Sequence, residues 1–252
     1  MFATERTLKK TFLAAALPVA MALSTVAAPV AGTAAERTDK ATFDIYLRGI
    51  KTGALAFTGV DNGASYAAAG KVESTGLVGA IVKVRYDASS NGAVKGDRFV
   101  PQSYTEKTTG VRNNESVMNF RGGVPQVKKY SPPKPPGPDD VNPATQAGSV
   151  DPMTAIYGAL RDVPRKDVCD YSVKMFDGKR ASKISLKGPK PTDTGFTCNG
   201  AYDRLKGWSP EEMAEKKHFP FTVTYNKIGD DLYRVSQIDL DTTFGRARMV
   251  RR

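Results

Sequence analysis

Short segments in which apolar and polar residues alternate dominate the sequence beyond residue 40. The alternation is clearest in residues 43–48, 82–88 and 219–225, and it is typical of strands with one buried face. Turn signals rich in Gly, Asn and Asp separate such segments at intervals of about 8 to 15 residues, as in antiparallel meanders. Asn91-Gly92, for example, is expected to close a strand as a type I′ hairpin.

About a dozen strands are expected, and a twisted sheet of that length must curl to bury its inner face. We therefore predict an all-β, mainly antiparallel fold: a curved meander sheet forming a barrel or half-barrel, with one or two short helices. Asp151-Pro152 is a good helix start for residues up to Leu160, and Ser209-Pro210-Glu211-Glu212 is a capping box. Residues 76–82 are compatible with a strand, a short helix or an apolar lip.

The first 35 residues have the pattern of an export signal. Basic residues precede an apolar run from Phe12 to Val30, and Thr33 and Ala35 suit a signal peptidase that cuts before Glu36. An uncleaved membrane anchor is the alternative. Residues 36–252 are then expected to form a single β-rich domain in the bacterial periplasm. A Pro-rich crossing loop at 131–150 lies within it, although the loop could also separate two domains.

The chain is basic, with 37 Lys and Arg against 26 Asp and Glu and a formal charge of +11. Export removes nucleic acid as a partner, which leaves lipid or protein of the envelope and peripheral contact with its anionic surface. No apolar stretch after the signal is long enough for a transmembrane segment. The best candidate basic patch consists of Lys179, Arg180, Lys183, Lys187, Arg246 and Arg248, with an ordinary solvated surface as the alternative.

Cys169 and Cys198 are the two cysteines of the chain. An oxidising compartment favours a disulfide between them, which would stabilise the fold by roughly 3 to 4 kcal/mol on the chain-entropy model. A redox role is the alternative, but the sequence has no C-x-x-C motif.

Recognisable catalytic motifs are scarce. His218 lacks the companions of a metal site, no cofactor is predicted, and Ser209 is better explained as a helix cap than as a nucleophile. Asp239 and Asp241 stand two apart on a predicted strand, so their carboxylates would lie on the same face of that strand. They would be close enough to raise the pKa of one of the two or to hold a cation between them.

The apolar and aromatic residues of the chain suggest a different kind of site. If the sheet curls widely, aromatic residues on its inner face would line a cavity for an acyl chain or a protein segment; if it curls tightly, they are core. These candidate lining residues are Phe43, Phe57, Tyr66, Tyr86, Tyr104, Phe219, Phe221 and Tyr225.

Several motifs resemble a known family. The segments 43–53 (FDIYLRGIKTG), 150–155 (VDPMTA), 176–180 (FDGKR), 198–202 (CNGAY) and 243–247 (TFGRA) are similar to the proteobacterial exported family catalogued as domain of unknown function 3108. The resemblance covers residues 41–250. It implies an envelope protein without an assigned catalytic residue.

Three kinds of function follow from these observations. The first is a periplasmic, non-enzymatic binding or scaffold protein that holds a lipid or a partner segment on a concave aromatic face. The second is an envelope hydrolase that uses Asp239 and Asp241, or other carboxylates, on cell-wall or acidic polymer. The third is a purely structural partner protein.

Overall fold

A single antiparallel sheet forms the body of the molecule. The computed structural model describes residues 36–252 apart from residues 112, 134 and 243; the predicted export signal at 1–35 lies outside them. The sheet has fourteen strands, and its order is β7-β6-β5-β4-β3-β2-β1-β14-β13-β12-β11-β10-β9, with β8 paired to β13. It curls into a nearly closed barrel, so the predicted fold class is confirmed.

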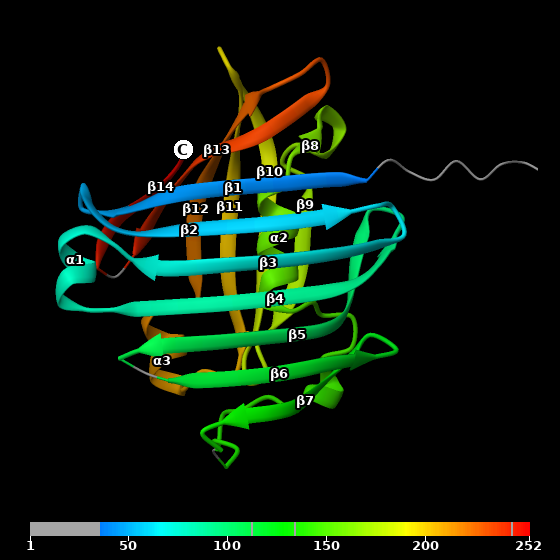
Figure 1. The fold of residues 1–252 in the computed structure, drawn as a ribbon, viewed down its shortest axis with the longest axis vertical. Helices are drawn as coiled ribbons and strands as arrows, with labels where there is room; N and C mark the ends of the chain where they lie inside the picture. The colour runs from blue at the N-terminus through cyan, green and yellow to red at the C-terminus, as the bar shows by residue number, and fades with distance from the viewer. Residues whose placement is uncertain (1–35, 112, 134, 243) are drawn as a thin grey trace, which may run out of the picture. The chain divides into compact units, whose positions relative to one another are not determined.

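The first seven strands form a continuous meander, and the remaining strands complete the sheet from the other side of β1 (Figure 1). The first group comprises β1 Arg37–Leu47, β2 Ile50–Asp61, β3 Ser65–Ser74, β4 Val84–Lys95, β5 Arg98–Gly110, β6 Asn114–Arg121 and β7 Val124–Ser131. The second comprises β8 Val163–Pro164, β9 Tyr171–Phe176, β10 Ala181–Thr192, β11 Gly195–Lys206, β12 His218–Lys227, β13 Leu232–Thr242 and β14 Gly245–Arg251.

Three short helices are described, and α2 and α3 lie where the sequence signals place them. They are α1 Gly76–Ile81, α2 Pro152–Leu160 and α3 Pro210–Glu215, with 3-10 turns η1 Pro143–Thr145 and η2 Arg165–Asp167. The Asp151 side chain caps α2, and Ser209 and Glu212 form the predicted capping box of α3. The ambiguous segment 76–82 is thus mainly helical.

The predicted turn at Asn91-Gly92 is wrong. Strand β4 continues through these residues with a register shift between them, and the chain turns at Gly96 instead. A side chain at Gly92 would lie 2.1 Å from the Val100 carbonyl oxygen, so this glycine permits a close approach of two strands. Glycine at position 92 therefore serves the close packing of two strands and does not form a turn.

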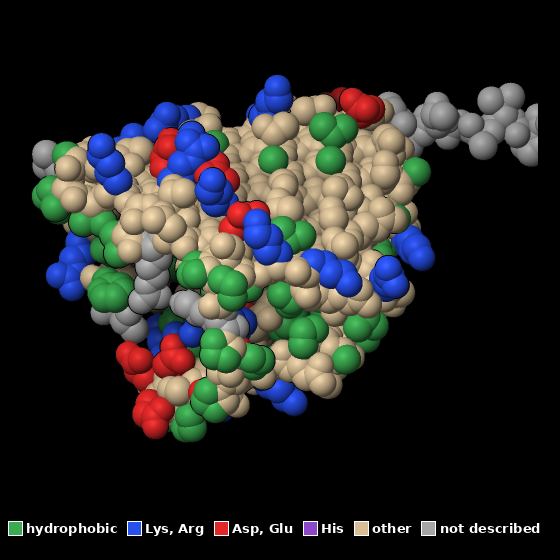
Figure 2. All heavy atoms as spheres, turned by 60° about the horizontal axis from the view of Figure 1, so that its bottom comes forward, with side chains coloured by type: hydrophobic (Ala, Val, Ile, Leu, Met, Phe, Trp, Pro, Cys, Tyr) green, Lys and Arg blue, Asp and Glu red, His purple; other side chains and the backbone are tan. Residues whose placement is uncertain are grey.

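The crossing loop follows the open edge of the sheet. Gly148 N donates to Gly123 O at 2.9 Å, in the β6–β7 turn, and Val150 pairs in parallel with Met175 of the edge strand β9. The loop therefore contacts both edges of the sheet: the β6–β7 turn at one edge and strand β9 at the other. On the face shown in Figure 2, some Lys and Arg side chains lie next to Asp and Glu side chains.

Candidate functional site: a cavity beside the inner helix

Helix α2 lies against the inner face of the sheet. It contacts β3, β4 and β5 as well as β9, and six of its nine residues are buried. Tyr157 of α2 packs against the rings of Phe57 and Tyr66. The space that the sequence suggested as an open aromatic hollow is therefore largely filled by this helix.

The eight aromatic residues proposed as a ligand lining have mainly become core. Five are buried, namely Phe43, Phe57, Tyr66, Tyr104 and Tyr225. Tyr86, Phe219 and Phe221 are half-buried. The alternation of apolar and polar residues predicted that these rings point inward. It carries no information on where α2 packs, and the position of α2 determines whether an inward ring lines a cavity or is packed in the core.

Buried carboxylates fix α2 at both ends. Asp151 accepts hydrogen bonds from Thr154 N at 2.8 Å and from Ser90 Oγ at 2.8 Å. Beyond the other end, Asp39 accepts from the Tyr157 hydroxyl and from Asp162 N, each at 3.1 Å. These bonds join α2 to strands β1 and β4, so the helix has a defined position within the sheet.

A cavity of about 590 Å³ remains beside α2, towards the open edge of the sheet. Its walls come from the start of β5, the crossing loop, α2 and the residue after it, the segment around η2, and β9. The apolar and aromatic lining residues are Phe99, Val100, Pro101, Val150, Val163, Tyr171, Val173 and Tyr225; the charged ones are Asp97, Arg98, Arg161, Asp167, Asp170, Lys174 and Lys183. Of the eight aromatic candidates, Tyr225 lines this cavity.

Arg161, which follows α2, is the distinctive polar group of the cavity. Its guanidinium carbon lies 5.4 Å from the centre of the Phe99 ring. Its Nε atom is buried and has no hydrogen-bond partner among the described residues. Sequence reasoning missed both residues, because neither belongs to a motif and they lie 62 positions apart (161 minus 99).

The tyrosines of the cavity are held neutral. Burial raises the pKa of Tyr171 and of Tyr225 well above the usual value of 10, although the positive charge of Arg161 partly opposes the shift. Their hydroxyls donate to carbonyl oxygens of α2, from Tyr171 to Ala155 at 3.0 Å and from Tyr225 to Ala159 at 3.3 Å. Both rings are thereby fixed as walls.

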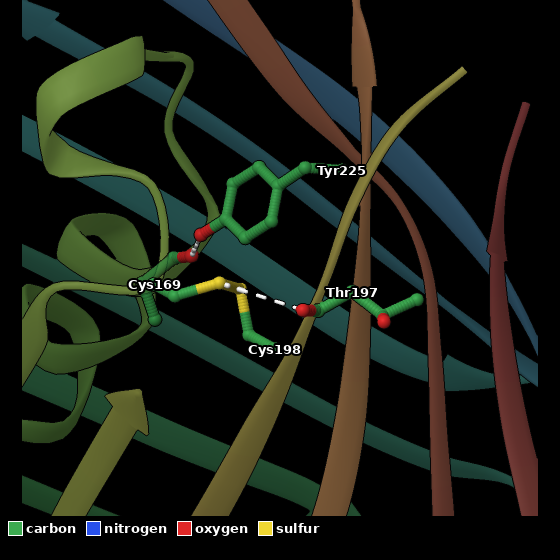
Figure 3. The surroundings of a disulfide bond; sticks show 5 residues. Cys169, Thr197, Cys198 and Tyr225 are labelled. Carbon is green, nitrogen blue, oxygen red and sulfur yellow. Dashed lines mark hydrogen bonds between the residues drawn. A yellow bond between two sulfur atoms is a disulfide. The ribbon is translucent and has the colours of Figure 1, made fainter. Parts of the chain in front are cut away.

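The predicted disulfide between Cys169 and Cys198 is confirmed. It joins the segment before β9 to strand β11, and Figure 3 shows it close to Tyr225. Asp170 and Tyr171, next to Cys169, line the cavity. The cross-link therefore anchors one cavity wall to strand β11.

The predicted basic patch is divided in the structure. Lys183, Lys187 and Arg246 line a shallow hollow of about 540 Å³ on the outer face of β10 to β14. Lys179 instead pairs with Asp140 of the crossing loop at 2.6 Å, and Arg180 lies over the Trp208 ring at 5.4 Å. Arg248 pairs with Asp239 at 2.7 Å.

The two carboxylates considered for hydrolysis share the outer hollow, as their spacing predicted. Burial alone would raise the pKa of Asp239, but hydrogen bonds from Arg248 and Gln237 outweigh it and the pKa is lowered. Asp241 is exposed. His218 bonds to Asp203 at 2.6 Å in the same hollow. Asp239 is thus held as a carboxylate within an ion-pair network.

Together these features define an antiparallel β-barrel-like protein with a short internal helix and a lateral cavity. No helix in the described parts of the chain is long and apolar enough to cross a membrane. The chain belongs to the family described as protein of unknown function (DUF3108), which matches residues 42–206.

Among solved structures, the chain is similar to a β-barrel-like protein of domain of unknown function DUF1849 from Brucella abortus. The two share 12% identity with a TM-score of 0.49, over 85% of this chain and 95% of that chain. Comparison with curated proteins gave no match.

Proposed function

We propose that this protein is a non-enzymatic binding protein of the cell envelope, which holds an amphiphilic ligand in the cavity beside α2. The cavity volume of about 590 Å³ falls within the range of small-molecule sites. Its apolar walls suit an acyl or other hydrocarbon group. Its walls include parts of helix α2 and of strands β5 and β9, so little of the protein has to be ordered on binding.

Arg161 is the observation that carries this proposal. A buried nitrogen without a hydrogen-bond partner costs free energy, and an acidic group of a ligand would supply the acceptor. The ligand class is therefore an amphiphile whose apolar part contacts Phe99, Tyr171 and Tyr225 and whose carboxylate or phosphate contacts Arg161.

The proposed compartment is the periplasm. Disulfides persist in oxidising compartments, and the bond between Cys169 and Cys198 is in keeping with one. The pattern of residues 1–35 supports the same location. The engagement of Asp239 with Arg248 favours binding over hydrolysis, because a general acid must be able to hold a proton.

Binding of a fluorescent fatty acid, compared with its methyl ester, tests the proposal. The wild-type protein should bind the acid more tightly than the ester. Arg161→Gln should weaken binding of the acid by about tenfold or more, as expected for a charge-assisted hydrogen bond, and leave the ester unchanged. Titration by fluorescence gives both affinities.

Two tryptophan variants on the same strand provide the matched control. Val100→Trp fills the cavity, whereas Thr105→Trp adds the same side chain at an exposed position of β5. Both should fold, as judged by circular dichroism, and only the first should lose the probe. Equal binding by the two variants would refute the assignment of the cavity.

A further inference from the structure

Exposed hydrophobic side chains are concentrated at one end of the β1–β6 strands. Nine large hydrophobic residues are exposed among the described residues, and six of them lie in or beside the turns at this end, on the left in Figure 1. We call these six the apolar rim: Ile50, Ile81, Val82, Val84, Val111 and Phe244. Isolated exposed apolar residues are ordinary, but a group at one end indicates a contact surface.

Contacts between the turns make the rim continuous. In the β1–β2 turn, Arg48 Nε donates to the Phe244 carbonyl oxygen at 2.7 Å, which joins this turn to the β13–β14 turn. Helix α1 packs against β2 on the other side. After α1, Val84 pairs with Gly110, the residue before Val111. The side chains of the rim therefore belong to neighbouring turns and not to separate faces.

The rim is also basic. None of the segments 48–52, 75–84, 109–113 and 242–246 contains Asp or Glu, whereas Arg48, Lys51, Lys83 and Arg246 lie within them. Figure 2 shows hydrophobic and basic side chains next to one another along the upper part of its left edge, with a group of acidic side chains below them. Asp44 is paired with Lys51 and Glu73 with Lys71, and Arg246 lies 3.7 Å from Asp239, whereas Asp241, next to segment 242–246, is exposed. Arg48 and Lys83 are exposed, so this end offers apolar tips beside two positive charges.

We propose that the apolar rim docks the protein on the surface of an anionic lipid bilayer. Phe244 and Ile81 are 72% and 85% exposed, so they can enter the boundary between headgroups and acyl chains without unfolding the turns. Arg48 and Lys83 would then lie at headgroup level, where basic residues are attracted to an anionic membrane. A bilayer fits this combination because it offers apolar depth and negative charge over an area wide enough for all the turns. The inference does not depend on the α2 cavity.

Flotation with lipid vesicles tests the docking surface, with protein purified from its own host. The wild-type protein should float with vesicles of equimolar phosphatidylcholine and phosphatidylglycerol, much less with phosphatidylcholine alone, and less as salt is raised. The double variant Ile81→Ser/Phe244→Ser should bind at least about tenfold more weakly, because the apolar contact is lost. Lys83→Glu should also weaken binding to the anionic vesicles.

Matched controls carry the same changes away from the rim. Val127→Ser/Ile228→Ser replaces exposed apolar residues elsewhere, and Lys95→Glu reverses a charge at the far end of β4. Both should bind vesicles like the wild type, and all variants should melt like it. Equal vesicle binding by the rim and control variants would overturn the proposal. So would a concentration-dependent dimer that only the rim substitutions abolish, together with no vesicle binding, since the rim would then bind a second copy.

Discussion

Asp151 is completely buried at the start of α2, where water cannot stabilise its charge. Burial raises its pKa above the usual 3.8, although hydrogen bonds from Thr154 and Ser90 oppose the shift. The folded protein therefore holds a proton on this carboxyl more tightly than the unfolded chain does. The stabilisation from that proton is complete below pH 3.8 and is lost as the pH rises through the raised pKa.

Asp151→Asn should remove this pH dependence. Asparagine still caps the helix and accepts hydrogen bonds but carries no charge. Urea unfolding from pH 4 to pH 7 should therefore show the wild type losing stability relative to the variant as the pH rises. Asp151→Ala should be less stable than the wild type by about 2 kcal/mol, because buried donors lose their acceptor.

The pKa of Asp44 is shifted in the opposite direction from that of Asp151. Hydrogen bonds from Arg252 and Lys51 lower its pKa to about 2, so its contribution is present above pH 3.8 and disappears as the pH falls towards 2. Asp44→Asn should therefore be less stable than the wild type above pH 3.8, and the difference should disappear as the pH falls towards 2. A wild type and an Asp151→Asn variant with parallel pH profiles would contradict the account of Asp151.

Local sequence patterns predicted individual strands and helices better than they predicted how these elements pack together. The alternation in residues 219–225 and the caps at Asp151 and Ser209 act within a few residues, and strand β12 and helices α2 and α3 follow them. Nothing local indicates that α2 enters the barrel, because that depends on complementary shapes far apart in the sequence. The cavity, which exists only beside the placed helix, could not be predicted for the same reason.

A substitution at Gly59 tests the position of α2 against the sheet. A side-chain carbon at this position of β2 would lie 2.1 Å from the Tyr157 ring, so the helix would have to move. Gly59→Ala should destabilise the protein by about 1 to 3 kcal/mol, the range for overpacking a core. Gly229→Ala is the control, since its nearest neighbour would be 3.7 Å away. If urea unfolding gave the same stability for both variants, α2 would not occupy the position described.

For the whole molecule, the open edge of the sheet is the feature that creates a site. The strand order ends at β7 and β9, and the crossing loop bridges this edge without filling the space behind it. A fully closed barrel packed on α2 would leave little room. The cavity and the apolar rim use separate residues, so ligand binding and membrane docking can be tested one without the other.

Native mass spectrometry of the protein purified from its own host tests the central claim most directly. The wild-type spectrum should contain a species heavier by the mass of an acidic amphiphile, and this species should be absent from Val100→Trp and retained in Thr105→Trp. A wild-type spectrum with the mass of the polypeptide alone, or an adduct that persists when Val100→Trp fills the cavity, would contradict the account.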